Sequence, residues 1–266
     1  MTFCDAHIHL SHCDFTTFFN SEFFNQNEYK CCTTFCLSKE IEEFYKAFCS
    51  IESKFFDPGE IEGHIKKSFG IHPQIFAEGI PESELKSELD FLENLLKKNQ
   101  IDAIGEIGFD LFSQEFKATL PLQEKYWQIQ AELAKKYEKP IIVHIRKAVE
   151  KIFKDSKLLS SLPAVVFHSF PGTLREAESI LNHGINAYFS FGKPILNGKK
   201  SAIDCVKNLS VERLLFETDA PYQTLKNEAQ TFPHEILRVY ECAANIREVS
   251  LESLCEKVRL NFEGLF

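Results

Sequence analysis

The stretch FCDAHIHL, residues 3–10, is an apolar segment that carries two histidines, His7 and His9, two positions apart. In a β-strand, residues i and i+2 lie on the same face, so both imidazoles are expected to point the same way. A buried imidazole without a hydrogen-bond partner is unfavourable, and a divalent metal ion gives both rings a partner at once. The stretch therefore predicts a strand that carries either a metal-binding pair or two hydrogen-bonded core histidines.

Short apolar runs of the same kind recur along the chain, and segments with helical spacing of apolar residues separate them. The expected strands are residues 2–9, 31–37, 68–71, 103–106, 141–144, 164–168, 187–191 and 214–218. The expected helices include residues 84–98, 122–137, 233–244 and 251–262. Strands separated by crossovers long enough for helices are typical of a TIM barrel, and no linker rich in glycine or serine divides the chain. We therefore predict an α/β fold, a (β/α)8 TIM barrel in which residues 1–266 form a single domain.

An aromatic-rich segment, residues 12–29, lies between the first two expected strands. We interpret it as a helix or loop packed on the barrel, in preference to a surface that binds membranes or stacks on bases.

The composition restricts where the protein works and what it binds. The chain has no run of about 18 apolar residues and no signal-peptide pattern, so we expect a soluble, cytoplasmic protein with no membrane partner. Its 9 cysteines have irregular spacing and include no CxxC pair, which indicates free thiols in a reducing compartment. The net charge of −9 argues against non-specific binding along nucleic acid, so any such substrate is expected to be bound locally.

Ionisable side chains also follow the apolar runs of four later strands, and these are Glu106, His144, His168 and Asp219. The C-terminal ends of barrel strands meet at one face, so we expect these side chains to converge with the two histidines of the first strand. Taken singly, each is as well explained by a hydrogen-bonded polar group in the core. A set of six metal-ligand side chains at one face is hard to explain by packing, because without a cation the carboxylates would repel one another.

This set of donors suits two divalent ions, Zn²⁺, Mg²⁺ or Mn²⁺, a pair that acidifies water and promotes phosphoryl displacement. Glu106 is expected to bridge the ions, and Asp219 to hold one ion while orienting or deprotonating the attacking water, so both are candidate catalytic residues. Glu217 precedes Asp219 by two positions on the same strand face. It either orients a ligand histidine or forms an ion pair within the barrel, and the sequence does not favour one role over the other.

An ordered series of segments resembles the motifs of the TatD-type metal-dependent deoxyribonucleases of the amidohydrolase superfamily. The segments are DAHIHL (5–10), FGIHPQ (69–74), AIGEIGFD (103–110), KPIIVHIRKA (139–148), VVFHSFPGT (165–173), AYFSFGKP (187–194), LLFETDAP (214–221) and NFEGLF (261–266). The resemblance implies a (β/α)8 barrel that cleaves phosphodiester bonds with divalent ions. At three positions this chain differs from the residue that is common in the family. Ser11 stands where an acid is common, Leu111 where an aromatic is common, and Ser169 where a cysteine is common.

The same resemblance assigns roles to individual residues. It places His7, His9, Glu106, His144, His168 and Asp219 at the ligand positions. It also implies that His72 lies near the substrate phosphate and that Arg146 contacts phosphate. With the acidic net charge, it predicts DNA as the partner, bound as ends or short single strands, and it implies no protein partner.

Two other functions remain open from the sequence. One is an amidohydrolase-type enzyme that acts on a small amide, ester or lactone, although many binuclear members of that group have a modified lysine where this chain has Glu106. The other is a non-catalytic barrel that binds a partner, which the complete set of candidate ligands argues against. Phe112 either stacks on a base or anchors a loop. The histidines outside the motifs, His12, His64, His183 and His234, are interpreted as surface or helix-capping residues.

Overall fold

Parallel strands follow one another in chain order around a nearly closed barrel in the computed structural model, which describes residues 1–14, 22–55 and 63–266. The strands are β1 (Thr2–Ile8), β2 (Glu28–Phe35), β3 (Ile65–Phe69), β4 (Ala103–Asp110), β5 (Ile141–Arg146), β6 (Val165–Phe167), β7 (Ala187–Phe191) and β8 (Leu214–Phe216). All 8 belong to one sheet with the order β1-β2-β3-β4-β5-β6-β7-β8. The predicted α/β fold, a TIM-type barrel, is confirmed.

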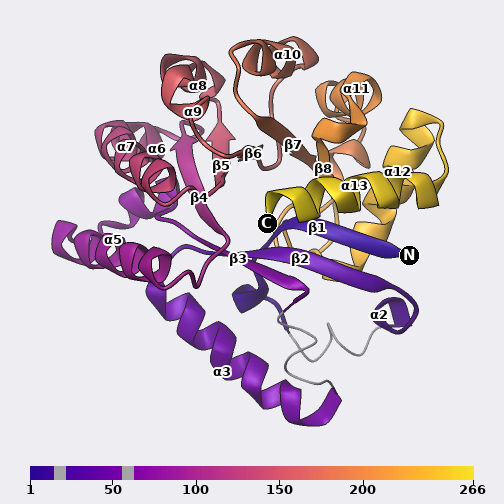
Figure 1. The fold of residues 1–266 in the computed structure, drawn as a ribbon, viewed down its shortest axis with the longest axis horizontal. Helices are drawn as coiled ribbons and strands as arrows, with labels where there is room; N and C mark the ends of the chain where they lie inside the picture. Colours follow the sequence, from indigo (N-terminus) through magenta and orange to yellow (C-terminus); the bar gives the residue numbers. More distant parts are fainter. Residues whose placement is uncertain (15–21, 56–62) are drawn as a thin grey trace.

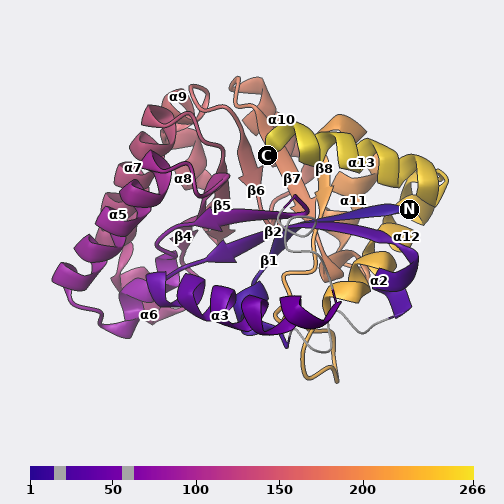
Figure 2. The same ribbon diagram turned by 60° about the horizontal axis from the view of Figure 1, so that its bottom comes forward.

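Helices connect the strands and lie on the outside of the barrel (Figure 1). They are α2 (Glu22–Gln26), α3 (Ser38–Phe55), α5 (Glu82–Lys97), α6 (Gln114–Ala118), α7 (Leu120–Lys136), α8 (Val149–Lys154), α9 (Ser156–Leu159), α10 (Leu174–Asn182), α11 (Lys200–Asn208), α12 (Ile236–Arg247) and α13 (Leu251–Leu265). Short 3₁₀ turns η1 (Leu10–His12), η2 (Pro73–Glu78), η3 (Lys193–Ile195), η4 (Val211–Arg213) and η5 (Pro233–Glu235) complete the connections. In Figure 2 the segment between β8 and α12 projects at the bottom of the view, on the same side as α3. No helix in the described ranges is long and apolar enough to cross a membrane.

The strand boundaries differ from the predicted ones where polar residues lie inside a strand. β3 begins at Ile65, earlier than predicted, because Lys66 and Lys67 are accommodated in the strand. β4 extends past Glu106 to Asp110, since Gly108 and Asp110 still pair with β5. The predicted aromatic segment 12–29 falls partly outside the described residues; its described part contains α2, whose Phe23 ring packs 5.4 Å from Phe3.

Gly108 is required where β4 approaches β5. Its φ is +143°, a conformation that side chains rarely adopt, and a Cβ built there would lie 2.1 Å from the backbone oxygen of His144. The second glycine of the GEIG motif therefore allows β4 to lie close enough to β5 to bring Glu106 and His144 together.

Backbone hydrogen bonds join β1 to the segment after β8. The amide of His9 donates to the carbonyl of Ala220 at 2.9 Å, and the amide of Asp219 donates to the carbonyl of His7 at 3.0 Å. On the outside of the barrel, the Tyr240 hydroxyl of α12 donates to the Cys4 carbonyl at 2.9 Å. These contacts bring the first and last strands together and place the β1 histidines beside Asp219.

Candidate metal centre

The histidines of the first strand point to the same side, as the two-residue spacing predicts. The Nε2 atoms of His7 and His9 lie 3.2 Å apart. His7 is fully buried and His9 nearly so. The Nδ1 atom of His9 is buried and has no hydrogen-bond partner among the residues that the structure describes. A histidine that only fills a core is normally hydrogen-bonded at both ring nitrogens, and His9 is not held in that way by the described residues.

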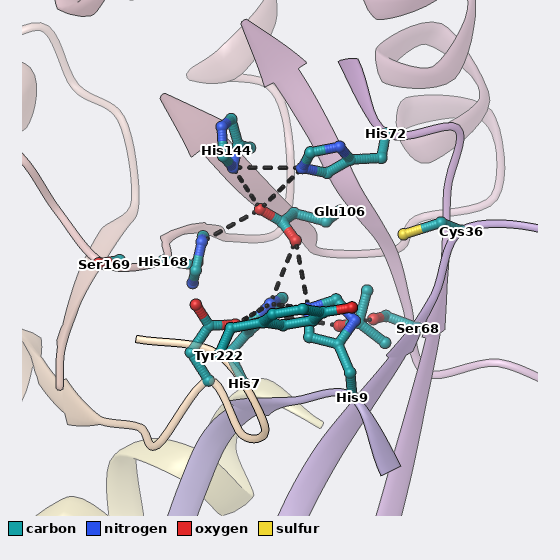
Figure 3. A network of polar contacts seen from close by, with 12 residues as sticks. His7, His9, Cys36, Ser68, His72, Glu106, His144, His168, Ser169 and Tyr222 are labelled. Atoms are coloured by element: carbon teal, nitrogen blue, oxygen red, sulfur yellow. Dashed lines mark hydrogen bonds and ion pairs between the residues drawn. The ribbon is translucent and has the colours of Figure 1, made fainter. Parts of the chain in front are cut away.

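Glu106 lies at the centre of the cluster, between two sets of imidazoles (Figure 3). Its Oε2 atom is 3.2 Å from Nε2 of His7 and 3.8 Å from Nε2 of His9. The other oxygen, Oε1, faces Nδ1 of His144 at 2.5 Å, Nε2 of His168 at 3.1 Å and Nε2 of His72 at 3.4 Å. The two oxygens of one carboxylate therefore face different groups of nitrogen donors.

Asp219 completes the side of the cluster formed by β1. Its Oδ1 atom lies 3.4 Å from Nε2 of His9 and 3.5 Å from Nε2 of His7. Its Oδ2 atom accepts a hydrogen bond from the Gln223 amide at 2.9 Å. The amide thus turns one carboxylate oxygen away and leaves the other facing the histidines.

Within the described ranges these donors form three overlapping groups whose ligand atoms lie within 4.8 Å of one another. The groups are His7, His168 and Asp219; His7, His9 and Glu106; and His72, Glu106 and His144. All six predicted ligands are brought together, and His72 joins them, although the resemblance placed it near the substrate. Buried nitrogen and oxygen donors at this spacing fit divalent ions such as zinc.

The charges in the cluster influence one another strongly. Burial alone would raise the pKa of Glu106, but the surrounding histidines, His168 above all, hold it well below the usual range. Burial alone would lower the pKa of His168, yet Glu106 and Glu217 hold it well above the usual value. The ion-free cluster therefore keeps its carboxylates ionised by holding protons on some of its histidines, and a bound cation would take the place of those protons.

Hydrogen-bonding groups behind the candidate ligand histidines set the orientation of their rings. Oε1 of Glu217 lies 3.1 Å from Nδ1 of His168. Oγ1 of Thr34 lies 3.2 Å from Nδ1 of His7. Such contacts fix which ring nitrogen carries a proton and which is left to bind an ion. Glu217 is fully buried and lies where the orienting role requires it.

Two buried aspartates near the cluster were not identified from the sequence. Oδ2 of Asp110 lies 3.2 Å from Nε2 of His144 and accepts a hydrogen bond from Gln74 at 2.7 Å. Asp5 accepts hydrogen bonds from the backbone amide of Thr218 at 2.9 Å and from its hydroxyl at 2.6 Å. Burial raises the pKa of Asp5 to about 7. Asp5 lies in the motif DAHIHL and Asp110 in the motif AIGEIGFD. Their place in these motifs was the only feature of the sequence that could have identified them as site residues.

Arg146 is exposed at the end of β5. Its guanidinium carbon is 3.8 Å from the centroid of the Phe112 ring, and Nζ of Lys147 is 4.6 Å from the same centroid. These residues form a positively charged rim beside β4 and β5. The sequence allowed two roles for Phe112, anchoring a loop or stacking on a base. In the structure its ring lies against these two cations.

His12, the last residue of the 3₁₀ turn η1, is exposed, as the surface interpretation predicts, but it also lies beside the cluster. Its ring stacks on that of His9 with centroids 5.7 Å apart, and its Nδ1 atom lies 2.9 Å from the hydroxyl of Tyr222. The sequence did not identify this contact, because it depends on the segment after β8 folding back over β1.

A barrel that gathers buried imidazoles and carboxylates at its strand ends is the architecture of a metal-dependent enzyme. The family model described as TatD related DNase matches residues 4–266. The chain therefore belongs to the TatD-related family of metal-dependent hydrolases.

Relatives with nuclease names and a solved structure resemble most of the chain. A human protein named "Deoxyribonuclease TATDN3" is 27% identical over 98% of this chain and 93% of its own length. A Salmonella typhimurium protein named "3'-5' ssDNA/RNA exonuclease TatD" is 28% identical over 66% of this chain and 69% of its own. The crystal structure of YjjV from Escherichia coli, a TatD homologue, covers 99% of this chain and 97% of its own with a TM-score of 0.79 and 24% identity. Other relatives are described only as uncharacterised metal-dependent hydrolases.

Proposed function

We propose that the protein is a metal-dependent phosphodiester hydrolase, a deoxyribonuclease that acts on DNA ends or short single strands. The division of the two Glu106 oxygens between two sets of histidines is the observation that carries this proposal. The names of the human and Salmonella relatives support the substrate class. The net charge of −9 favours local binding of a strand end over binding along a duplex.

The donor set fits two divalent ions, Zn²⁺, Mg²⁺ or Mn²⁺. We assign one to His7, His9, Glu106 and Asp219, and the other to Glu106, His144 and His168. When bound, such ions acidify water and offset negative charge on a phosphate.

Asp219 and Glu106 have the catalytic roles in this proposal. Oδ1 of Asp219 faces the cluster while Gln223 holds Oδ2, so Oδ1 is the atom that accepts a proton from the attacking water. Glu106 stays ionised because its pKa is held well below the usual range, chiefly by His168 against the effect of burial, and both of its oxygens remain available. Glu217 keeps Nε2 of His168 directed at the cluster through its contact with Nδ1.

We assign phosphate binding to His72 and Arg146. Nε2 of His72 faces the same Glu106 oxygen as His144 and His168, so a phosphate reaching that side of the cluster meets it. Arg146 presents its guanidinium from the adjacent rim, where Phe112 holds the side chain.

The test is the release of nucleotides from a single-stranded DNA oligomer with added Mn²⁺ or Mg²⁺. We expect an Asp219→Ala variant to lose activity by roughly a hundredfold or more, in the range seen when a catalytic acid or base is removed. Asp90→Ala, the same change at an exposed position of α5, is the matched control and is expected to keep the wild-type rate. Equal rates for the wild type and Asp219→Ala would refute the assignment. Faster turnover of a panel of amides and lactones than of DNA would favour an amidohydrolase instead.

We also propose that the protein works in the cytoplasm without a protein partner. The 8 cysteines whose side chains the structure describes are free thiols, and six of them are buried, as suits a reducing compartment.

A further inference from the structure

Two exposed aromatic rings lie at the end of the barrel that carries the metal cluster. Phe112 follows β4 and is 49% exposed; Tyr222 follows β8 and is 48% exposed. The backbone amide of Tyr222 donates to the carbonyl of Asp219 at 2.7 Å, and its ring meets that of His9 edge-on, with centroids 5.1 Å apart. An apolar ring half exposed to solvent beside buried ligands is placed to contact whatever approaches them.

Tyr222 is held in place by a chain of polar contacts that ends in a nearly buried carboxylate. Its hydroxyl lies 2.9 Å from Nδ1 of His12. Nε2 of His12 lies 3.8 Å from Oε1 of Glu40, and the other oxygen of Glu40 accepts the backbone amide of Cys36 at 2.7 Å. A proton on Nε2 of His12 would face the Glu40 carboxylate, and in that tautomer Nδ1 accepts the hydrogen bond from the phenol.

This arrangement leaves the Tyr222 ring, not its hydroxyl, to meet the substrate. The hydroxyl is directed back toward His12. The ring lies beside His9 at the edge of the cluster (Figure 3). A ring already held in one conformation loses little entropy when a flat partner binds. Bases of single-stranded nucleic acid stack on aromatic side chains of this kind, whatever their sequence.

Phe112 on the opposite side of the mouth has a different environment. Arg146 and Lys147 lie over its ring, at 3.8 Å and 4.6 Å from its centroid. This pairing orders two cations and suits a phosphate contact. The two sides of the mouth thus differ in chemistry, with charge beside β4 and β5 and an aromatic surface beside β8 and β1.

We propose that Tyr222 stacks on the nucleobase next to the phosphate that is cleaved, and that His12 and Glu40 are positioning residues that hold its ring. The inference rests on the proposed nuclease function and adds a base-binding subsite to it. Neither residue type nor position within a motif indicated this role, because it depends on the contact between η1 and the segment after β8.

The experiment compares normal DNA oligomers with oligomers in which one nucleotide near the cleaved end is replaced by an abasic analogue. For the wild type, KM is expected to rise roughly tenfold when the stacked base is missing, in keeping with the usual strength of base–aromatic stacking. For Tyr222→Ala, KM should be equally high with both oligomers. Tyr222→Phe keeps the ring but loses the contact with His12, so it is expected to retain the discrimination with a smaller difference in KM between the two oligomers.

Tyr45→Ala is the matched control, since Tyr45 on α3 is also exposed, at 41%, and lies on the outer helix layer. It should discriminate between the oligomers as the wild type does. A Tyr222→Ala variant that still discriminates, or one whose kcat falls equally with both oligomers while KM is unchanged, would overturn the inference. Failure of the wild type to cleave any oligomer with Mn²⁺ or Mg²⁺ would instead refute the proposed function, and this is seen before any variant is compared.

Discussion

Glu217→Gln tests whether the buried carboxylate behind His168 tunes the metal centre or only packs within the barrel. Glu217 is fully buried, its Oε1 atom lies 3.1 Å from Nδ1 of His168, and its Oε2 atom has no hydrogen-bond partner within the described part of the chain. Glutamine keeps the size of the side chain and an oxygen that can accept the same hydrogen bond. The substitution therefore removes the negative charge with little change in packing.

The size of the effect follows from that hydrogen bond. A hydrogen bond to a charged group contributes about 1.5–3 kcal/mol and a neutral one about 1 kcal/mol, so the variant loses roughly 0.5–2 kcal/mol of support for His168 as a ligand. That corresponds to roughly 2- to 30-fold weaker binding of the ion, which overlaps the range of about 10- to 100-fold seen when such supporting groups are changed. We expect the affinity for the ion assigned to His168 to fall and the affinity for the ion assigned to His7 and His9 to change little.

Calorimetric titration of the ion-free protein with Mn²⁺ or Zn²⁺ measures both affinities. Glu88→Gln is the matched control, because Glu88 is also buried but accepts its hydrogen bonds from Ser38, outside the cluster. It should bind both ions as the wild type does. If both affinities of Glu217→Gln equal those of the wild type to within roughly twofold, the orienting role is refuted and Glu217 is a structural carboxylate.

Three further predictions concern the barrel and its protons. Gly108→Ala places a methyl group against the His144 carbonyl at a φ of +143° and should destabilise the fold by about 3 kcal/mol or more. The melting temperature should fall by several degrees, and an unchanged melting temperature would contradict this. Tyr240→Phe removes a hydroxyl bonded to both backbone groups of Cys4 and should cost about 1–3 kcal/mol in urea unfolding, whereas a change below 0.5 kcal/mol, roughly the noise of such a substitution, would show the contact to be unimportant. Burial opposes a charge on His168, but Glu106 and Glu217 raise its pKa well above the usual value, so the ion-free protein holds a proton there at neutral pH. This proton stabilises the ion-free fold fully below pH about 6.5, the pKa of an unfolded histidine. The stabilisation is lost as pH rises through the folded pKa. Metal binding near pH 7 should then release protons, measured by calorimetry in buffers of different ionisation enthalpy, and a heat that does not depend on the buffer would oppose this.

The barrel and the convergence of the candidate ligands could be predicted because each depends on local patterns. A strand with histidines two positions apart places them on one face whatever the rest of the chain does, so His7 and His9 were predictable. Glu106 and His168 come at the ends of apolar runs, and parallel strands in a barrel bring such ends to one face. Chain order alone was sufficient for these residues.

The supporting residues could not be predicted in the same way, since their roles depend on contacts between distant segments. Asp5 is joined to Thr218 across 213 positions of sequence, and His12 to Tyr222 across 210. Neither contact has a periodicity in the sequence. The end of β4 was missed for a related reason: Gly105 and Gly108 weaken a strand pattern, but they are needed here because β4 lies so close to β5.

The central claim is that Glu106 bridges two ions held by histidines from opposite sides of the barrel mouth. The anomalous difference map of a crystal grown with Mn²⁺, measured at the manganese edge, tests it most directly. The account predicts two peaks, one at each carboxylate oxygen of Glu106, the first also contacted by His7, His9 and Asp219 and the second by His144 and His168. A single peak, or peaks that lie away from Glu106, would contradict it.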